Sequence, residues 1–345
     1  MSDGGQAKLR LIQCGVGGHG GGWFVNSVLP SNDFELAAIV DPNAEAIAKA
    51  SETAGRELRA FVDLSEAIDA VEADAVLSVT PPKVHPAHAK LAAEAKLHLL
   101  VEKPLAEDVE VARKMVDDAA KAGTMLMVGQ NRRWDSEPRG IKAALDSGRV
   151  GHVDHVHIDF FRAADFRGSF RHSMPHVLLV DMAVHHIDLL RYFMGREVVR
   201  VFADEFNPKR SVDNAIYQHG AAIRMVMTLD DGSRVSYAGD WSAVGRPSSW
   251  HGDWTFQGDK GRLTFSDDRG LEVATSDGWA REVEVESLPI PELPQSQGQL
   301  LAAFAESVRT GEPGLTSGDD NLRTVAAVLA AVESCETGKP VDVRY

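Results

Sequence analysis

Apolar residues in the first part of the chain fall into short runs separated by helical patterns. The runs expected to be strands cover residues 9–14, 35–40, 75–79, 97–101 and 125–129. Between them, residues 44–54, 85–95 and 109–122 carry Ala, Glu, Lys and Leu at helical spacing. Such alternation is typical of βαβ units. The pattern predicts an α/β Rossmann domain with a doubly wound parallel sheet over residues 1–131.

The pattern changes after a helical stretch near residues 138–147. Longer strands are expected at 153–162, 215–229, 233–241, 254–257 and 262–265, with a hairpin signal at Asp231-Gly232. These strands predict an α+β domain with a large, mainly antiparallel sheet over residues 132–345. Helices near 297–310 and 319–337 close the chain. It stays open whether these last helices pack back on the Rossmann domain.

Charge and cysteine content narrow the function classes. The 345 residues carry a formal net charge of −15, which disfavours nucleic acid and anionic membranes as partners. The two cysteines, Cys14 and Cys335, imply no disulfide framework. The first residues lack the basic region and apolar core of an export signal, so we expect a cytoplasmic protein.

A glycine-rich fingerprint follows the first strand. Its residues are Gly15, Val16, Gly17, Gly18, His19 and Gly20, a G-x-G-x-x-G pattern that lets backbone amides approach a pyrophosphate. A Gly-rich surface turn has the same pattern, but Asp41 closes the second strand where an acidic side chain can bind both ribose hydroxyls. Because that carboxylate repels a 2′-phosphate, we expect NAD rather than NADP. Gly21 and Gly22 come next, and the cost of glycine in a helix predicts that the first helix starts late.

Two further stretches carry candidate catalytic groups. Lys103 follows the strand at 97–101, at the edge where ligands bind in open α/β sheets. If residues 180–192 are helical, Asp181, His185 and Asp188 share one face. A histidine can exchange a proton with a substrate hydroxyl, and a lysine can favour a developing alkoxide. A solvated lysine, a helix N-cap and a core histidine are the alternative interpretations of Lys103, Asp181 and His185.

The chain resembles the Gfo/Idh/MocA family of oxidoreductases, which includes inositol dehydrogenases and glucose-fructose oxidoreductase. The matching motifs are the glycine fingerprint, Asp41, Thr80-Pro81-Pro82 with His85, Glu102-Lys103-Pro104, residues 129–133, residues 181–188 and residues 258–261. The resemblance implies that Lys103 is the catalytic lysine, His185 the acid/base and Asp181 its partner. Ala183 stands where the family usually has glycine, which concerns the geometry of helix entry rather than the chemistry.

The resemblance also implies which residues bind the cofactor and the substrate. Thr80 and Pro81 would line the nicotinamide ribose and pyrophosphate, and Glu102 would contact the ribose. The expected cofactor set is Gly15, Gly17, Gly18, His19, Gly20, Asp41, Thr80, Pro81, His85, Glu102, Lys103 and Arg133. Asp188 or Arg133 is expected to reach the substrate, beside Lys103, Asp181 and His185.

Three other groups of residues have two interpretations each. Seven histidines between residues 152 and 186 match no zinc-site spacing, so we expect no metal. On the strand at 153–162, His155, His157 and Asp159 form a polar face that suits either a substrate cleft or solvent, and Asp159 is kept as a substrate candidate. Trp241, Trp250 and Trp254 suit either stacking on a sugar ring or ordinary packing.

Together these features predict an NAD-dependent oxidoreductase. It would transfer a hydride between nicotinamide and a secondary hydroxyl or ketone of a sugar, polyol or inositol-like substrate. The alternatives are a redox-neutral NAD-dependent glycosidase or eliminating enzyme, and a non-catalytic NAD-sensing regulator. We also expect a homodimer or homotetramer that associates through the C-terminal sheet.

Overall fold

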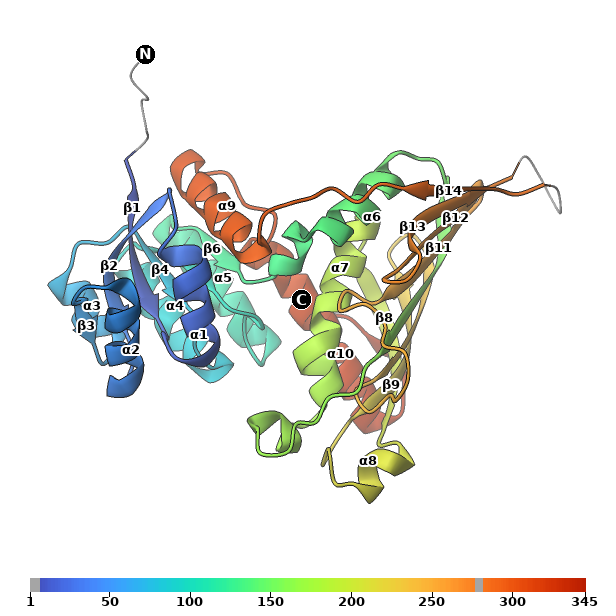
Figure 1. Ribbon diagram of the computed structural model, residues 1–345, viewed down its shortest axis with the longest axis horizontal. Coiled ribbons are helices and arrows are strands. Elements are labelled where there is room, and N and C mark those ends of the chain that lie inside the picture. Colours follow the sequence, from blue (N-terminus) through green and yellow to red (C-terminus); the bar gives the residue numbers. More distant parts are fainter. Residues whose placement is uncertain (1–6, 277–281) are drawn as a thin grey trace, which may run out of the picture. The chain divides into compact units, whose positions relative to one another are not determined.

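The structure, a computed structural model, describes residues 7–276 and 282–345 and divides into two compact units (Figure 1). The first unit comprises Met1–Trp134 and Pro294–Val325, and the second comprises Asp135–Leu293 and Ala326–Tyr345. The chain therefore leaves the first unit after residue 134, returns to it at residue 294, and enters the second unit again after residue 325.

Six parallel strands form the sheet of the first unit, in the order β3-β2-β1-β4-β5-β6. Its strands are β1 (Leu9–Cys14), β2 (Phe34–Val40), β3 (Ala60–Phe61), β4 (Ala75–Ser78), β5 (His98–Val101) and β6 (Leu126–Val128). Its helices are α1 (Gly18–Trp23), α2 (Ala44–Ala54), α3 (Leu64–Ala70), α4 (His85–Glu94), α5 (Val109–Ala122), α9 (Ser296–Thr310) and the first part of α10 (Gly318–Thr337). The predicted doubly wound Rossmann sheet is confirmed.

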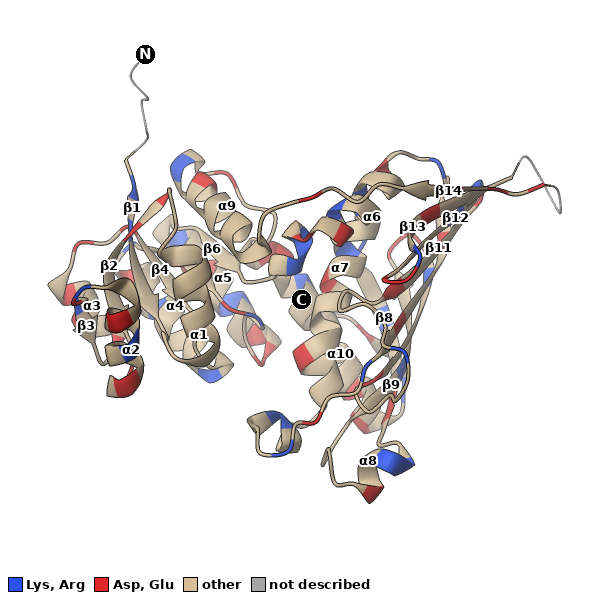
Figure 2. Ribbon diagram, in the orientation of Figure 1, with Lys and Arg blue, Asp and Glu red and all other residues tan. Residues whose placement is uncertain are grey.

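Local sequence explains these elements. Strands β4, β5 and β6 contain no Asp, Glu, Lys or Arg, and the ribbon labelled β4 is tan in Figure 2. Strands covered on both faces need such continuous apolar runs. The side chains of Asn43 and Asp108 cap the N-termini of α2 and α5, and the left-handed residues Gly55 and Gly123 end the same helices.

The prediction that the first helix starts late is wrong. Helix α1 begins at Gly18, so Gly21 and Gly22 lie inside it, and a π-helical turn, Phe24–Val28, continues it. A Cβ atom on Gly20 would lie 2.2 Å from the carbonyl oxygen of Gly15. Glycine is tolerated here because the first turn of the helix packs directly on the backbone of the loop before it.

A nine-stranded sheet dominates the second unit, in the order β14-β13-β12-β11-β7-β10-β9-β8-β15. Its strands are β7 (Val153–Phe161), β8 (Val198–Phe206), β9 (Ala222–Leu229), β10 (Arg234–Asp240), β11 (Asp253–Gly258), β12 (Gly261–Ser266), β13 (Gly270–Thr275), β14 (Glu284–Leu288) and β15 (Val341–Asp342). Neighbouring strands are antiparallel except β7 and β10. The predicted mainly antiparallel sheet is confirmed.

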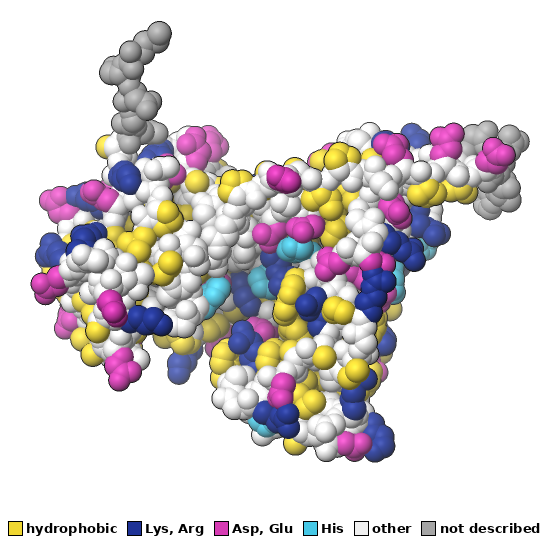
Figure 3. Space-filling model, in the orientation of Figure 1, with side chains coloured by type: hydrophobic (Ala, Val, Ile, Leu, Met, Phe, Trp, Pro, Cys, Tyr) yellow, Lys and Arg dark blue, Asp and Glu magenta, His cyan; other side chains and the backbone are white. Residues whose placement is uncertain are grey.

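Helices of the second unit cover one face of this sheet. They are α6 (Ser136–Asp146), α7 (Val184–Met194) and the end of α10, while the short α8 (Lys209–Asp213) precedes β9. Val156, Ile158 and Phe160 of β7 share one hydrophobic core with Val184 and Ile187 of α7. The strand predicted over 215–229 begins only at Ala222, because Ala215 and Gly220 have positive φ angles that extended backbone does not allow. On the face shown in Figure 3, acidic and basic side chains are interspersed.

Candidate cofactor and catalytic site

Most of the predicted cofactor residues lie at one edge of the first sheet. The glycine loop follows β1, Asp41 follows β2, Thr80 follows β4, and Glu102 and Lys103 follow β5. Because all six strands are parallel, their carboxyl ends meet at the same edge. The strand order changes direction between β1 and β4, which is where doubly wound sheets bind nucleotides.

The glycine loop packs tightly against this edge. Gly15 has a φ of +83°, and a Cβ atom there would lie 2.1 Å from the carbonyl oxygen of Val79. The N-cap of α1 is Gly17, which has no side chain to occupy the amides of the first helical turn. A Cβ atom on Gly18 would meet no atom within 4 Å. The loop therefore leaves backbone amides and space for an anionic group such as a pyrophosphate.

Asp41 holds the glycine loop in place. One carboxylate oxygen accepts hydrogen bonds from the backbone amides of Val16 at 2.9 Å and Gly17 at 3.3 Å. The other accepts from the amide of Asn43 at 2.9 Å. A carboxylate has about four lone-pair sites, so it can still accept a bond from a ribose hydroxyl. These residues fit the adenosine and pyrophosphate parts of NAD.

Glu102 connects the glycine loop to the loop that carries Lys103. Its Oε1 lies 2.9 Å from His19 Nε2 and accepts a hydrogen bond from Trp23 Nε1 at 2.7 Å. Its Oε2 accepts from the backbone amide of Lys103 at 2.9 Å. Burial alone would raise the pKa of Glu102, but the bond and charge of His19, the charge of Lys103 and the bond from Trp23 hold it below the ordinary value. The carboxylate therefore stays ionised beside the lysine.

His85 is buried and supports two loops rather than presenting a free ring. Its Nε2 lies 2.9 Å from the carbonyl oxygen of Thr80, and its Nδ1 lies 3.0 Å from that of Pro104. The peptide bond between Lys103 and Pro104 is cis. Burial lowers the pKa of His85. The ring thus sits between the segment of Thr80 and Pro81 and the segment of Lys103.

Arg133 anchors the returning C-terminal segment. Its guanidinium is buried and bonds the carbonyl oxygen of Leu315 at 2.7 Å and the carboxylate of Asp320 at 2.7 Å. Both partners belong to Pro294–Val325 of the same unit. These contacts satisfy the buried charge of Arg133 within the first unit.

Asp181 and His185 lie where a π-helical turn, Leu178–Ala183, passes into α7. His185 is 7% exposed. Both carboxylate oxygens of Asp181 accept bonds from Arg171, at 2.7 Å from Nε and 3.1 Å from Nη2. Sequence reasoning missed Arg171, because it lies in a single 3₁₀ turn, Phe170–Ser173, which is too short to show a hydrophobic period. Asp188 is on the same helix and is buried, so little of its carboxylate is accessible to a substrate.

Asp159, predicted as a substrate residue, lies on the other face of the sheet. In β7, Val156, Ile158 and Phe160 point toward α7, and alternation turns His157 and Asp159 away. His157 Nε2 lies 3.0 Å from the Asp159 carboxylate on that outer face. The structure therefore does not bring Asp159 together with Asp181 and His185.

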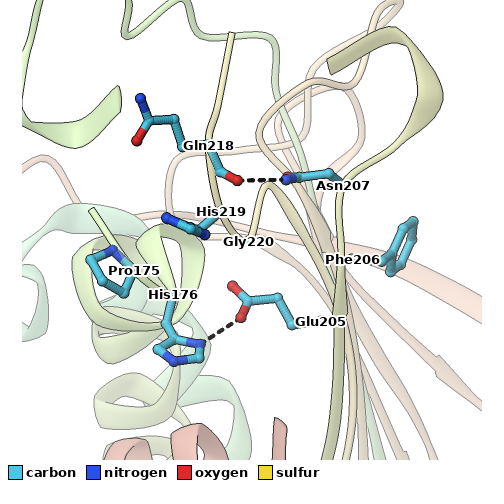
Figure 4. Close-up of a pocket in the computed structure, with 8 residues that line it drawn as sticks. All are labelled: Pro175, His176, Glu205, Phe206, Asn207, Gln218, His219 and Gly220. Atoms are coloured by element: carbon cyan, nitrogen blue, oxygen red, sulfur yellow. Dashed lines mark hydrogen bonds and ion pairs between the residues drawn. The ribbon is translucent and has the colours of Figure 1, made fainter. Parts of the chain in front are cut away.

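A pocket of about 300 Å³ lies elsewhere in the second unit (Figure 4). It is lined by Pro175, His176, Glu205, Phe206, Asn207, Gln218, His219 and Gly220. His176 Nδ1 lies 2.5 Å from Glu205, and this bond raises the pKa of His176. Within residues 7–276 and 282–345, no three or more His, Cys, Asp or Glu side chains group to hold a metal ion.

Comparison with protein families identifies the class of protein. Residues 9–130 match the oxidoreductase family with an NAD-binding Rossmann fold, and residues 139–264 match the GFO/IDH/MocA C-terminal domain. These two matches cover most of the chain. The protein is a member of the Gfo/Idh/MocA family of oxidoreductases.

Individual relatives agree with this assignment. The chain is 27% identical to myo-inositol 2-dehydrogenase of Thermotoga maritima, covering 90% of this chain and 92% of that protein. It is 28% identical to D-apiose dehydrogenase of Paraburkholderia graminis, covering 90% and 83%. The fold matches an oxidoreductase from Agrobacterium radiobacter in complex with NAD+, L-tartaric acid and magnesium, with a TM-score of 0.86, 23% identity and coverage of 97% and 98%. None of the helices described here is long and apolar enough to cross a membrane.

Buried His88 predicts a loss of stability in acid. Its Nδ1 lies 2.8 Å from the hydroxyl of Ser78 at the end of β4. Burial, and secondly the charge of His85, lower the pKa of His88 to about 4. As the pH falls, His88 is protonated in the unfolded chain before it is protonated in the folded protein. The free energy of unfolding is therefore highest above about pH 6.5 and decreases by up to about 3 kcal/mol as the pH approaches 4.

Urea unfolding of the parent and of His88→Gln at pH 7, 6 and 5 checks this. We expect the variant to lose less stability over that range than the parent. His155→Gln, which removes an exposed imidazole from the second unit, is the control. Equal pH slopes for the parent and His88→Gln would contradict the prediction.

Proposed function

We propose that the protein is an NAD-dependent dehydrogenase or reductase of a sugar, polyol or inositol-like substrate. The observation that carries the proposal is the position of Lys103. It directly follows Glu102, whose buried carboxylate bonds both His19 in α1 and the backbone amide of Lys103. Inositol and apiose dehydrogenases among its relatives support the substrate class. The family membership supports hydride transfer as the reaction.

Each catalytic residue has one role in this proposal. Bound NAD would accept a hydride from the carbinol carbon, or return one as NADH. The ammonium group of Lys103 donates a hydrogen bond to the reacting oxygen and stabilises its developing negative charge. His185 takes the hydroxyl proton during oxidation and returns it during reduction. Asp181, held by Arg171, orients His185.

Replacing either catalytic group should abolish most turnover. Lys103→Met and His185→Asn are each expected to lower kcat by about 10²–10⁴-fold, because the oxygen and its proton lose their partners. The measurement is NADH absorbance at 340 nm across inositols, aldoses, sugar acids and anhydrosugars, in both directions. Lys114→Met, on the exposed surface of α5, is the control. Unchanged turnover in Lys103→Met would refute the assignment.

Asp41 supports NAD as the cofactor rather than NADP. Its carboxylate lies at the end of β2, where it would repel a 2′-phosphate. Asp41→Asn keeps an oxygen that can accept from Val16 and Gly17 but removes the charge. We expect the variant to discriminate less between NAD and NADP, which would appear as a fall in the ratio of KM for NADP to KM for NAD. A parent enzyme that prefers NADP would contradict this.

The outer face of the nine-stranded sheet supports a homodimer or homotetramer. Phe202, Phe206 and Val226 are exposed large apolar residues of β8 and β9. Because exposed apolar patches of this kind commonly mark protein interfaces, we expect association through this face. Light scattering of the purified protein should give a dimer or tetramer, and Val226→Lys should shift it toward monomer. A parent protein that is monomeric at micromolar concentration would refute the interface.

The cysteines are compatible with a reducing compartment. Cys14 and Cys335 are both free. Proteins with free thiols and no disulfide fit the cytoplasm, where we expect this enzyme to act. Cell fractionation that found the protein outside the cytoplasm would contradict this location.

A further inference from the structure

Arg162 lies at the end of β7, on the helix-covered side of the second sheet. Ile158 and Phe160 point to that side, and strand alternation places Arg162 there as well. Its backbone amide donates to the carbonyl oxygen of Asp240 at 3.0 Å, so the ladder continues past the last residue of the strand. Arg162 therefore shares the side of the sheet that carries α7.

No carboxylate neutralises Arg162 in the described parts of the chain. Nη1 donates to the carbonyl oxygen of Ser248. The adjacent carboxylate, that of Asp240, is engaged elsewhere, because one oxygen accepts from Arg210 at 2.9 Å and the other from Ser242 Oγ at 2.7 Å. Within the described residues, the N–H groups on Nε and Nη2 of Arg162 therefore have no hydrogen-bond acceptor and can donate to a ligand. A partly buried cation without an anion is unusual in a chain with 51 acidic residues against 36 basic ones.

Trp250 provides an aromatic surface directly beside this cation. The guanidinium carbon of Arg162 lies 4.1 Å from the centre of the indole ring. Trp250 is 48% exposed, whereas Trp241 and Trp254 are 1% exposed and belong to the core. Packing against Trp241 at 5.9 Å holds the indole in place. Among Trp241, Trp250 and Trp254, only Trp250 is therefore exposed enough to stack on a ligand.

Contacts within the second unit connect this pair to the helix of the proposed acid/base. His186, the neighbour of His185, lies 3.3 Å through its Nε2 from the carbonyl oxygen of Trp250. Trp241 packs on Phe166 at 5.3 Å, and the guanidinium of Arg171 lies 5.6 Å from the Phe166 ring. Arg171 is the residue that bonds Asp181. One aromatic cluster thus extends from the Arg162 pair to the Arg171–Asp181 pair.

We propose that Arg162 and Trp250 form a carboxylate subsite, so that the substrate is a sugar acid, such as a uronate or aldonate, rather than a neutral sugar. The Nε and Nη2 edge of Arg162 binds the carboxylate in the side-on, bidentate way that guanidinium groups favour. The indole of Trp250 stacks on the carbon skeleton. This inference rests on the proposed function, which supplies the hydroxyl to be oxidised.

Matched ligand pairs test the subsite with the full-length protein in the presence of NAD. D-glucuronate and D-glucose differ only at C6, and D-gluconate and D-glucitol differ only at C1. Calorimetry should show the acid of at least one pair, or of the corresponding galactose-derived pairs, binding about tenfold tighter or more than its neutral partner. The preference should weaken as salt is raised, because the added ions screen the charge.

Variants assign that preference to Arg162. Arg162→Gln should remove the advantage of the acid and leave the neutral partner unchanged, and Arg162→Lys should restore part of it because the charge returns without the planar fork. Arg234→Gln is the matched control, since Arg234 also bonds only a backbone carbonyl but is exposed at the far end of β10. Thermal unfolding of each variant shows whether the fold is intact.

The outcomes separate this inference from the proposed function. Acids that bind no tighter than neutral sugars, or that lose no affinity in a folded Arg162→Gln, overturn the subsite. Oxidation of neutral sugars alone overturns the subsite but supports the dehydrogenase. Acid binding that depends on Arg162 without hydride transfer in either direction supports the subsite and overturns the dehydrogenase.

Discussion

A single buried carboxylate, that of Glu102, connects the first helix to the loop of Lys103 at the carboxyl ends of the parallel strands. It bonds His19 and Trp23 of the first helix, which lie 83 and 79 residues before Glu102, and it also bonds the backbone amide of Lys103. Gly129 makes room for it, since a Cβ atom there would lie 3.2 Å from the Glu102 side chain. Because a buried carboxylate must be satisfied by donors, the glycine loop and the lysine cannot shift independently of each other.

The two sheets present their candidate functional residues in different ways. Parallel strands place all their carboxyl ends at one edge, so the first unit can gather a glycine loop, Asp41 and Lys103 there. The mainly antiparallel sheet of the second unit has one face covered by α6 and α7 and one face with exposed side chains. Asp181 and His185 belong to the helical segment on the covered face, and Arg162 follows the end of β7 on the same side. The other face carries Phe202 and Val226.

Much of the fold could be predicted from the periodicity of apolar residues. Helices α2 and α5 and strand β1 were predicted with the bounds that the structure shows. Strands β8, β13 and β14 were not predicted, because charged residues interrupt them on an exposed face. Their pairing with neighbouring strands, which the local pattern does not contain, is what makes them strands.

The sequence by itself determined the fold class and the family, and it supplied the candidate groups in the glycine loop and at Lys103, Asp181 and His185, because periodicity and motif spacing are local properties of the chain. Only the tertiary structure decided which polar residues have partners. Arg133 is an anchor for the C-terminal segment, Asp159 faces away from α7, and Arg171 bonds Asp181. These roles depend on contacts between residues from separate elements, and such contacts exist only after the strands have chosen their neighbours and each side chain has been assigned a face.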